Sequence, residues 1–403
     1  MQTSALSIAL MLPLSACVLD IQPADDTPVV GDGKGDGSTQ PIEICAGVLA
    51  DPSGGTPASQ AIQACLDAAP SGGELALPAG TYRVTTLIHV GHGLTLHTAG
   101  IAPNAPACLV QGAPACATLK ADPNVVVDRG FVRLEDSDVT IEHITIDGNR
   151  SARIASMAAQ HCAAGTNGPG FNASAAGCMH CTLVMSATVN ALCGSGFEWN
   201  GANAFIGGNL VRGNGDHTKH NMWSDGITVI ASEGASVVSN YFSDNSDVDL
   251  IVGSNRGGLV KQNTVVHAAQ DSFAGLMLDN FNGTSPGDFV DAQVIENTIT
   301  CNGRCDYGIQ LGPHPWYASA NIQGGLVAAN SVTGARMGID ADGAGTAAAP
   351  MTVTNNQVGT TPASATFLCG LRPSARFNVS PDSVIDVGAG PAPDAAMTVH
   401  DCP

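Results

Sequence analysis

The sequence predicts an all-β protein that folds as a right-handed parallel β-helix with a short N-terminal capping helix. Three observations support this prediction. An asparagine-centred pattern recurs from residue 209 onward, and a second apolar strand follows it in each repeat. Aromatic residues make up only 4% and charged residues 12% of the 403-residue chain, which also holds 48 glycines. A narrow solenoid interior needs small and β-branched side chains, whereas a wide globular core would use more aromatic rings.

The recurrent asparagines mark one bend of each coil. They occur at spacings of 31, 23, 34, 33 and 26 residues, starting from Asn209. The shortest spacing is about one bare turn of a three-sided solenoid, and the longer ones add an inserted loop. An asparagine at a bend can hydrogen-bond to the asparagines one coil above and below. We therefore predict one internal ladder, made of Asn240, Asn263, Asn297, Asn330 and Asn356.

The second strand of each coil aligns equally well. Side chains alternate along a strand, so two rows should face the interior. They are Ile227, Leu250, Leu276, Ile309 and Ile339, then Val229, Val252, Leu278, Leu311 and Ala341. The same alternation sends a further row outward, which consists of glycines except for Asp249. Because glycine has no side chain, this row should leave the floor of a groove open. It also gives Asp225 an inward or corner position.

The N-terminal part of the solenoid carries the resemblance to a known family. Apolar residues at helical spacing between residues 59 and 69 predict an amphipathic helix that covers the open end. The chain then reads Gly73-Glu-Leu-Ala-Leu-Pro-Ala-Gly-Thr-Tyr82. This helix, turn and strand resemble the opening of the pectate-lyase-like superfamily. The resemblance covers most of residues 59–358 and implies a pectate-lyase-like solenoid, but it is less specific for chemistry. Residues 151–180 interrupt the repeat, as a cysteine-pinned loop or lid would.

Both ends of the chain are expected to lie outside the solenoid. A short apolar run ends in Leu14-Ser15-Ala16-Cys17, which resembles the lipobox of bacterial lipoproteins. The resemblance implies cleavage before Cys17, lipidation of that cysteine, and an exported protein at the outer membrane or cell surface, or one that is secreted. No Lys or Arg precedes the run, so an atypical signal and a start further upstream both stay open. The predicted segments are a signal peptide (1–17), a flexible tether (18–40), the β-helix domain (41–360) and a C-terminal cap (361–403).

The charge and the cysteines narrow the partners and the compartment. A net charge of −20 argues against a nucleic-acid partner, and it would repel an acidic polysaccharide unless a cation such as Ca²⁺ bridges the two. We expect a monomer. With Cys17 lipidated, twelve of the 13 cysteines remain, an even number that suits disulfides in an oxidising compartment. The expected local pairs are Cys108–Cys116, Cys162–Cys178, Cys181–Cys193, Cys301–Cys305 and Cys369–Cys402.

A groove along the second strands is the predicted binding site. Alternation sends Asp247, Asp249 and Asp279 outward on neighbouring coils. Loops bring aromatic and histidine side chains to the rim, and sugar rings stack on aromatic faces. The expected substrate-binding residues are Trp223, Asp279, Gln310, His314, Trp316, Tyr317 and Arg336. The expected catalytic residues are Asp225, Asp247, Asp249 and His220. The alternative is a solvated acidic face without function.

Two enzymatic functions are compatible with this groove. Ser224-Asp225-Gly226-Ile227, followed by Asp247-Val248-Asp249, resembles the Thr-Asp-Gly and Asp-Asp motifs of polygalacturonase-type glycoside hydrolases. The resemblance implies that Asp247 is the general acid of an inverting hydrolysis and that Asp225 helps to hold the water. Val248 replaces the family's second aspartate, and the Gly-His-Gly and Arg-x-Lys motifs are missing from the following coils.

The second enzymatic reading is a lyase that acts on a uronic-acid glycan. A lyase needs a base and a cation that neutralises the uronate carboxyl. The expected cation is Ca²⁺ held by Asp247, Asp249 and Asp279. The candidate bases are Arg336, Arg256, Lys219, His217 and His220. A third reading is not enzymatic: a glycan-binding or adhesin-like surface lipoprotein.

Overall fold

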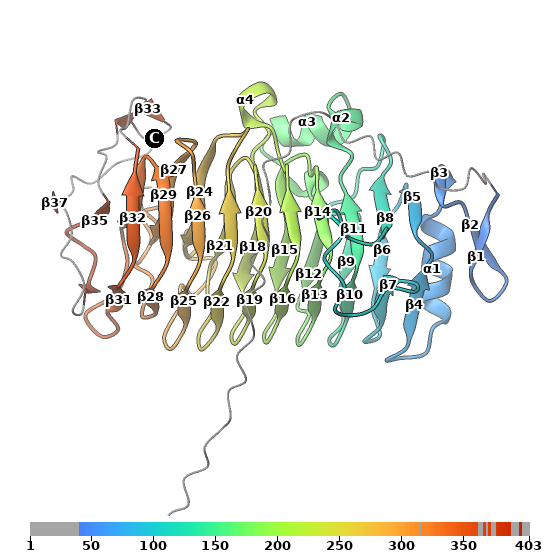
Figure 1. Ribbon diagram of the computed structural model, residues 1–403, viewed down its shortest axis with the longest axis horizontal. Coiled ribbons are helices and arrows are strands. Elements are labelled where there is room, and N and C mark those ends of the chain that lie inside the picture. The colour runs from blue at the N-terminus through green and yellow to red at the C-terminus, as the bar shows by residue number, and fades with distance from the viewer. Residues whose placement is uncertain are drawn as a thin grey trace, which may run out of the picture. The chain divides into compact units, whose positions relative to one another are not determined.

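Successive coils of the chain each add one strand to three parallel sheets of 11 strands (Figure 1). The computed structural model describes residues 40–314, 316–361, 366–367, 370–371, 376–387 and 395–396. The predicted signal peptide, most of the predicted tether and Cys17 therefore lie outside the described residues. Within them the predicted fold is confirmed: the protein is a right-handed parallel β-helix.

The three sheets are numbered by the order in which a coil visits them. Sheet 1 contains β4 (Glu74–Leu77), β7 (Thr95–Thr98), β10 (Thr140–Glu142), β13 (Thr182–Val184), β16 (Phe205–Gly207), β19 (Ser236–Val238), β22 (Leu259–Lys261), β25 (Gln293–Ile295), β28 (Leu326–Ala328), β31 (Met351–Thr354) and β36 (Ile385–Asp386). Sheet 2 contains β3 (Ser53–Pro57), β5 (Gly80–Val84), β8 (Ala117–Ala121), β11 (Ile144–Asp147), β14 (Ala187–Val189), β17 (Leu210–Arg212), β20 (Tyr241–Ser243), β23 (Thr264–Val266), β26 (Thr298–Thr300), β29 (Ser331–Ala335) and β32 (Gln357–Thr360). Sheet 3 contains β6 (Ile88–Val90), β9 (Val132–Leu134), β12 (Ala173–Ala176), β15 (Gly194–Asn200), β18 (Ser224–Ala231), β21 (Val248–Val252), β24 (Ser272–Leu278), β27 (Cys305–Leu311), β30 (Met337–Ala341), β35 (Phe377–Val379) and β37 (Ala395–Ala396).

The remaining elements cover the ends and one edge of the solenoid. Helix α1 (Ser59–Ala68) buries Ile62, Cys65 and Leu66 against the first coil, which confirms the predicted cap. The hairpin of β1 (Ile42–Cys45) and β2 (Val48–Ala50) packs beside it. The interruption after residue 150 folds as α2 (Arg150–Arg153), α3 (Met157–Ala163) and the 3₁₀ turn Gly168–Gly170 before β12, and α4 (His217–His220) follows later. A second small hairpin joins β33 (Thr366–Phe367) and β34 (Gly370–Leu371).

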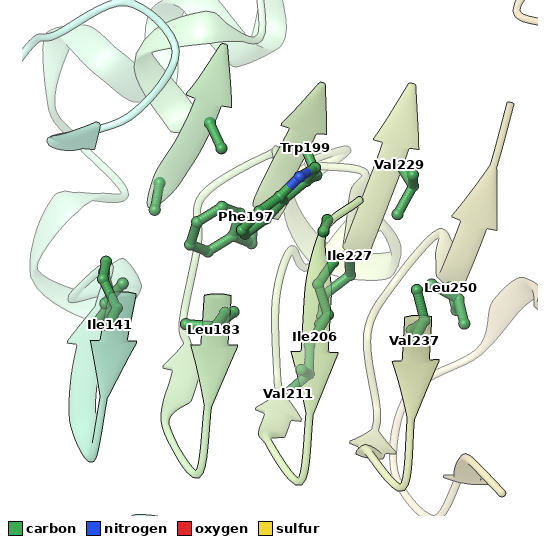
Figure 2. Close-up of a cluster of buried hydrophobic side chains, with 14 of the residues drawn as sticks. Ile141, Leu183, Phe197, Trp199, Ile206, Val211, Ile227, Val229, Val237 and Leu250 are labelled. Atoms are coloured by element: carbon green, nitrogen blue, oxygen red, sulfur yellow. The ribbon is translucent and has the colours of Figure 1, made fainter. Parts of the chain in front are cut away.

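The interior is filled by rows of apolar side chains that stack from coil to coil. Both predicted rows of sheet 3 are confirmed: Ile227 pairs with Leu250 and Val229 with Val252, and the register continues into the later coils. Figure 2 shows such side chains reaching inward from neighbouring strands. Phe197 and Trp199 fill a wider stretch, with their rings stacked and the centroids 5.2 Å apart.

The glycine row of sheet 3 faces the interior, so its predicted outward position is wrong. A Cβ added at Gly275 would lie 2.6 Å from Ile299 Cγ2, and one added at Gly308 would lie 2.2 Å from Val332 Cγ1. Both contacts are core side chains of sheet 2. Each strand of sheet 3 therefore points two consecutive residues inward, one from this row and one from the Ile227 row. This break in alternation turns the preceding row, which contains Asp225, toward the outside.

The predicted asparagine ladder is confirmed and starts one coil earlier, at Asn209. Each amide Nδ2 in the ladder donates to the Oδ1 of the next asparagine at 2.9 Å. The same Oδ1 accepts the backbone N–H of the preceding asparagine at 3.0 Å. Each side chain thus satisfies buried groups at a bend where no strand pairing reaches them.

Truncating a central member of the ladder should be costly. Asn263→Ala would leave the buried N–H and amide of Asn240 without their acceptor, and we expect it to lower the free energy of unfolding by about 2–3 kcal/mol. Asn356→Ala is the matched control, because this last member is only partly buried and should cost less. Urea denaturation of both variants measures the difference. Equal costs would contradict the role of burial.

Five disulfides lie among the described residues, and they confirm two of the predicted pairs. Cys108–Cys116 and Cys301–Cys305 are as expected. The other two testable pairs are wrong: Cys162 bonds to Cys193, and Cys178 to Cys181. The reason is that α3 brings Cys162 to the segment directly before β15, where Cys193 lies. Cys45–Cys65, which was not predicted, ties α1 to β1. The pair Cys369–Cys402 lies outside the described residues.

The solenoid does not stop where its end was predicted. Strands β35 and β36 extend sheets 3 and 1 beyond residue 360, into the segment expected to be a separate cap. Among the described residues, no helix combines the length and the apolar character needed to cross a membrane.

Candidate functional site

A cavity of about 350 Å³ opens on the outer face of sheet 3. Three carboxyl groups and five aromatic rings line it together with three aliphatic side chains: Trp223, Asp225, Asp247, Val248, Ile251, Phe273, Met277, Asp279, Phe281, Trp316 and Tyr317. The acids come from three consecutive coils, at the start of β18, just before β21 and just after β24. We call this cavity the acid cleft.

Two inserted loops build the aromatic walls of the acid cleft. The first carries α4 and ends at Trp223, whose ring stacks on His217 with the centroids 3.9 Å apart. The second follows β27 and carries Trp316 and Tyr317. Trp316 meets the ring of Phe273 edge-on, with the centroids 4.9 Å apart. The predicted association of aromatic loops with groove acids is therefore present in the structure.

Asp225 points into the cleft, which corrects the expectation of an inward or corner position. Its Oδ1 accepts the backbone N–H of Val248 at 3.2 Å, and its Oδ2 accepts the hydroxyl of Thr228 at 2.7 Å. These two hydrogen bonds hold the carboxyl rigidly. Burial raises the pKa of Asp225 well above its usual range, and the nearby Asp247 adds to this effect.

The other two acids of the cleft are also held in a dry environment. Burial raises the pKa of Asp247 to about 7 and the pKa of Asp279 to about 6. Asp279 is only 1% exposed, and its Oδ1 accepts no hydrogen bond in the described part of the chain. Carboxyl groups with raised pKa values that share a cleft are typical of acid–base catalysis.

Asp249 lies inside the solenoid, so its predicted place in the groove is wrong. Its position belongs to the inward glycine row, and the side chain is fully buried. Asp249 Oδ2 lies 2.6 Å from Nε2 of the buried His267, and Oδ1 accepts the amide of Asn245 at 2.8 Å. Sequence reasoning did not single out His267. Its only signal is a histidine directly after the core strand β23.

Four other predicted site residues do not line the acid cleft. His220 pairs with Asp216, Nδ1 to Oδ2 at 2.9 Å, and Arg336 pairs with Asp306 at 2.7 Å. Gln310 is fully buried and donates its amide to the carbonyl of His314 at 2.7 Å. His314 itself turns toward two acids of the next coils. The cleft residues that the sequence analysis missed are Val248, Ile251, Phe273, Met277 and Phe281.

The three residues predicted to bind Ca²⁺, Asp247, Asp249 and Asp279, do not form one site. Asp247 and Asp279 line the acid cleft, but Asp249 faces the interior with His267. Within the described ranges, one group of three side chains offers metal-ligating atoms that all lie within 4.8 Å of one another: His314, Asp342 and Asp382. Uptake of Ca²⁺ by Asp247 and Asp279 stays a prediction.

Comparison with known proteins finds the same fold at low sequence identity. No family model and no curated protein matches the chain. A tailspike protein variant of E. coli bacteriophage HK620, solved with a pentasaccharide, has a TM-score of 0.51 and 12% identity, covering 86% of this chain and 62% of the tailspike. The Dettilon tailspike protein has a TM-score of 0.50 and 15% identity, over 85% and 64% of the two chains. A polygalacturonase from Erwinia carotovora ssp. carotovora has a TM-score of 0.49 and 14% identity, over 85% and 94%. The protein thus shares its fold with the two tailspike structures, and this fold is the right-handed parallel β-helix that its sequence predicts.

Proposed function

We propose that the protein hydrolyses a polysaccharide in the acid cleft, and that the bound part of the glycan is uncharged. One observation carries the proposal: Asp225, Asp247 and Asp279 converge on one aromatic-walled cavity with raised pKa values. An isolated solvated face would leave such carboxyls exposed and ionised. The bound pentasaccharide of the HK620 tailspike supports an oligosaccharide as the class of ligand on this fold.

The three carboxyls can divide the work of an inverting hydrolysis. Burial raises the pKa of both Asp225 and Asp247, and repulsion from Asp247 adds to this effect at Asp225, so the pair holds one proton. Both oxygens of Asp225 accept hydrogen bonds, which favours its ionised form, and we assign the shared proton to Asp247 on this geometry. Asp247 then donates this proton to the glycosidic oxygen as the bond to the anomeric carbon breaks. Asp279, ionised above about pH 6, accepts a proton from the water that forms the new bond to that carbon. Asp225 stabilises the positive charge that develops on the sugar ring.

The lining of the cleft decides between neutral and acidic glycans. Among the described residues that line it there is no Lys, Arg or His. A uronate carboxyl would meet three aspartates without a cation, in a protein of net charge −20. Trp223, Trp316 and Tyr317 offer ring faces and edges on which a neutral pyranose can pack.

A lyase and a non-catalytic binder are the other candidates. A lyase needs a base next to the carbon that loses its proton, and two candidate bases are engaged elsewhere: Arg336 pairs with Asp306 and Arg256 with Asp288. A binder has no use for three acids whose pKa values are raised by burial, because carboxyl groups held in such surroundings lower stability. Both observations favour the hydrolase.

A product assay on a panel of glycans tests the proposal. Neutral and uronic-acid polysaccharides are incubated with the full chain, and reducing ends and ultraviolet absorbance are measured in parallel. A hydrolase releases reducing ends from a neutral glycan without new absorbance. Absorbance from unsaturated uronates would establish the lyase instead, and binding without either product would establish the binder.

We also propose that the protein is exported and anchored through a lipid on Cys17. The five disulfides support an oxidising compartment. Cys17→Ser should move the protein from the membrane fraction to the soluble fraction of the cells that make it, as measured by immunoblotting. A wild-type protein found only in the soluble fraction would contradict the anchor.

A further inference from the structure

A second cluster of acids lies at the C-terminal end of sheet 3, outside the acid cleft. Asp340 belongs to β30 and Asp342 follows that strand directly. His314 comes from the loop after β27 and Asp382 from the turn after β35. Ligand atoms of His314, Asp342 and Asp382 all lie within 4.8 Å of one another. None of these residues lines the acid cleft, so the cluster needs an explanation of its own.

The burial of two of these acids indicates a missing positive charge. Asp340 and Asp342 are fully buried, and among the described residues no hydrogen bond of good geometry reaches any of their four carboxyl oxygens. The side chains of Gln310, Ser380 and His314 lie near them and favour their ionised forms. His314 Nδ1 lies 3.5 Å from Asp342 Oδ1. Buried carboxylates are normally paired or bound to a metal ion, because an uncompensated one is strongly destabilising. In the described part of the chain no Lys or Arg forms an ion pair with either acid.

The orientation of His314 suits a metal ligand. Its Nε2 lies 3.2 Å from the carbonyl oxygen of Ser319, where it can donate a hydrogen bond. The lone pair of the neutral ring is then on Nδ1, which faces Asp382 Oδ2 at 2.9 Å and Asp342 Oδ1 at 3.5 Å. Histidines that bind a metal usually donate their second ring nitrogen to a carbonyl or carboxylate in this way. A protonated ring could also face the two acids, and the experiment below separates the two cases.

We propose that His314, Asp342 and Asp382 bind a divalent transition-metal ion of the Zn²⁺ type. Imidazole nitrogen suits Zn²⁺ and its neighbours in the first transition row, whereas Ca²⁺ prefers an all-oxygen shell of six to eight ligands. Three protein ligands leave the fourth position of a tetrahedral Zn²⁺ site for water. Asp340, two residues before Asp342, is close enough to interact with that carboxyl, and its ionised form would favour a bound cation.

The proposed site would fasten two segments of different coils. Asp382 lies in a turn in which Ser380 donates its hydroxyl to the Asp382 carboxylate. His314 precedes Trp316 and Tyr317, which form one wall of the acid cleft. A metal ion here would hold this wall against the C-terminal coils. The site rests on its own residues and does not depend on the proposed hydrolysis.

Calorimetric titration of the full chain with metal tests the proposal. The protein, prepared without a histidine tag, is treated with chelator and dialysed to remove the chelator. It is then titrated with ZnCl₂ and separately with CaCl₂. We expect one Zn²⁺ per chain and no comparable binding of Ca²⁺. Asp342→Asn and Asp382→Asn should each weaken Zn²⁺ binding at least tenfold. Asp291→Asn removes an exposed carboxylate in another turn and should leave binding unchanged.

Thermal unfolding with and without ZnCl₂ gives an independent measurement. Zn²⁺ should raise the Tm of the wild type and of Asp291→Asn but not of Asp342→Asn. If Asp342→Asn fails to fold, Asp382→Asn still decides, because Asp382 is exposed. No Zn²⁺ binding by the wild type would overturn the proposal and would indicate a protonated His314 that pairs with the two acids. Binding of Zn²⁺ by Asp342→Asn and Asp382→Asn as tight as that of the wild type would place the metal on other histidines. Ca²⁺ binding as tight as that of Zn²⁺ would also overturn the proposal.

Discussion

Asp247→Asn is expected to lower the turnover of a cleaved glycan by about 10²- to 10⁴-fold. An amide cannot donate the proton that the leaving oxygen needs, while the size of the side chain and its packing against the cleft stay the same. Asp279→Asn should have a comparable effect through loss of the base. The measurement is the initial rate of reducing-end release, with binding of the glycan followed separately so that kcat and KM are resolved.

The pH profile identifies the roles of the two acids. Asp279 must be ionised and Asp247 protonated, so the rate should rise as pH increases through about 6 and fall above about 7. Asp291→Asn serves as the control, since an asparagine tolerates the left-handed backbone of this exposed turn. Full turnover in both Asp247→Asn and Asp279→Asn would show that the cleft acids do not act on the substrate.

His267→Ala is expected to lower the free energy of unfolding by about 3–5 kcal/mol. Both ring nitrogens of His267 are engaged, Nε2 with Asp249 at 2.6 Å and Nδ1 with the carbonyl of Gln270 at 2.9 Å. Burial lowers the pKa of His267, but the charge of Asp249 and the hydrogen bond to it outweigh burial and raise that pKa. The surroundings therefore favour the charged form of the ring inside the solenoid, and its removal leaves the buried carboxyl of Asp249 with only the amide of Asn245 as a hydrogen-bond donor.

A double-mutant cycle isolates this pair. Asp249→Ala together with His267→Ala removes both charges, so the double variant should lose clearly less than the sum of the two single variants. Chemical denaturation at neutral pH gives the three values. Additive losses, or a loss under about 1 kcal/mol for His267→Ala, would contradict a tightly coupled buried ion pair.

The sequence analysis succeeded where one coil repeats the next. The asparagine ladder and the inward rows of Ile227 and Val229 follow from a pattern that each coil restates, so the register could be read without coordinates. The predicted helix at residues 59–69 is also a local pattern. The family resemblance pointed to the same fold, and the solenoid forms as expected.

Features that depend on contacts between coils could not be predicted. Asp249 faces inward because sheets 3 and 2 approach closely at the glycine row, and its partner His267 lies on the next coil. Cys162 bonds to Cys193 because α3 brings it to the segment directly before β15, although Cys178 is nearer in sequence. The apolar floor of the cleft was visible in the sequence. Ile251 and Met277 occupy matching positions on neighbouring coils, in a row of side chains that was predicted to face outward.

The cleft carboxyls serve the proposed chemistry at a cost in stability, and the pH dependence of unfolding measures that cost most directly. The pKa of Asp279 is raised from 3.8 to about 6, so its stabilising protonated form is complete below about pH 4 and is lost as pH rises through 6. Asp279→Asn cannot ionise. Its stability relative to the wild type should therefore increase by about 2–3 kcal/mol between pH 4 and pH 8. A difference that stays constant across this range would contradict a carboxyl whose pKa is raised by burial in the cleft.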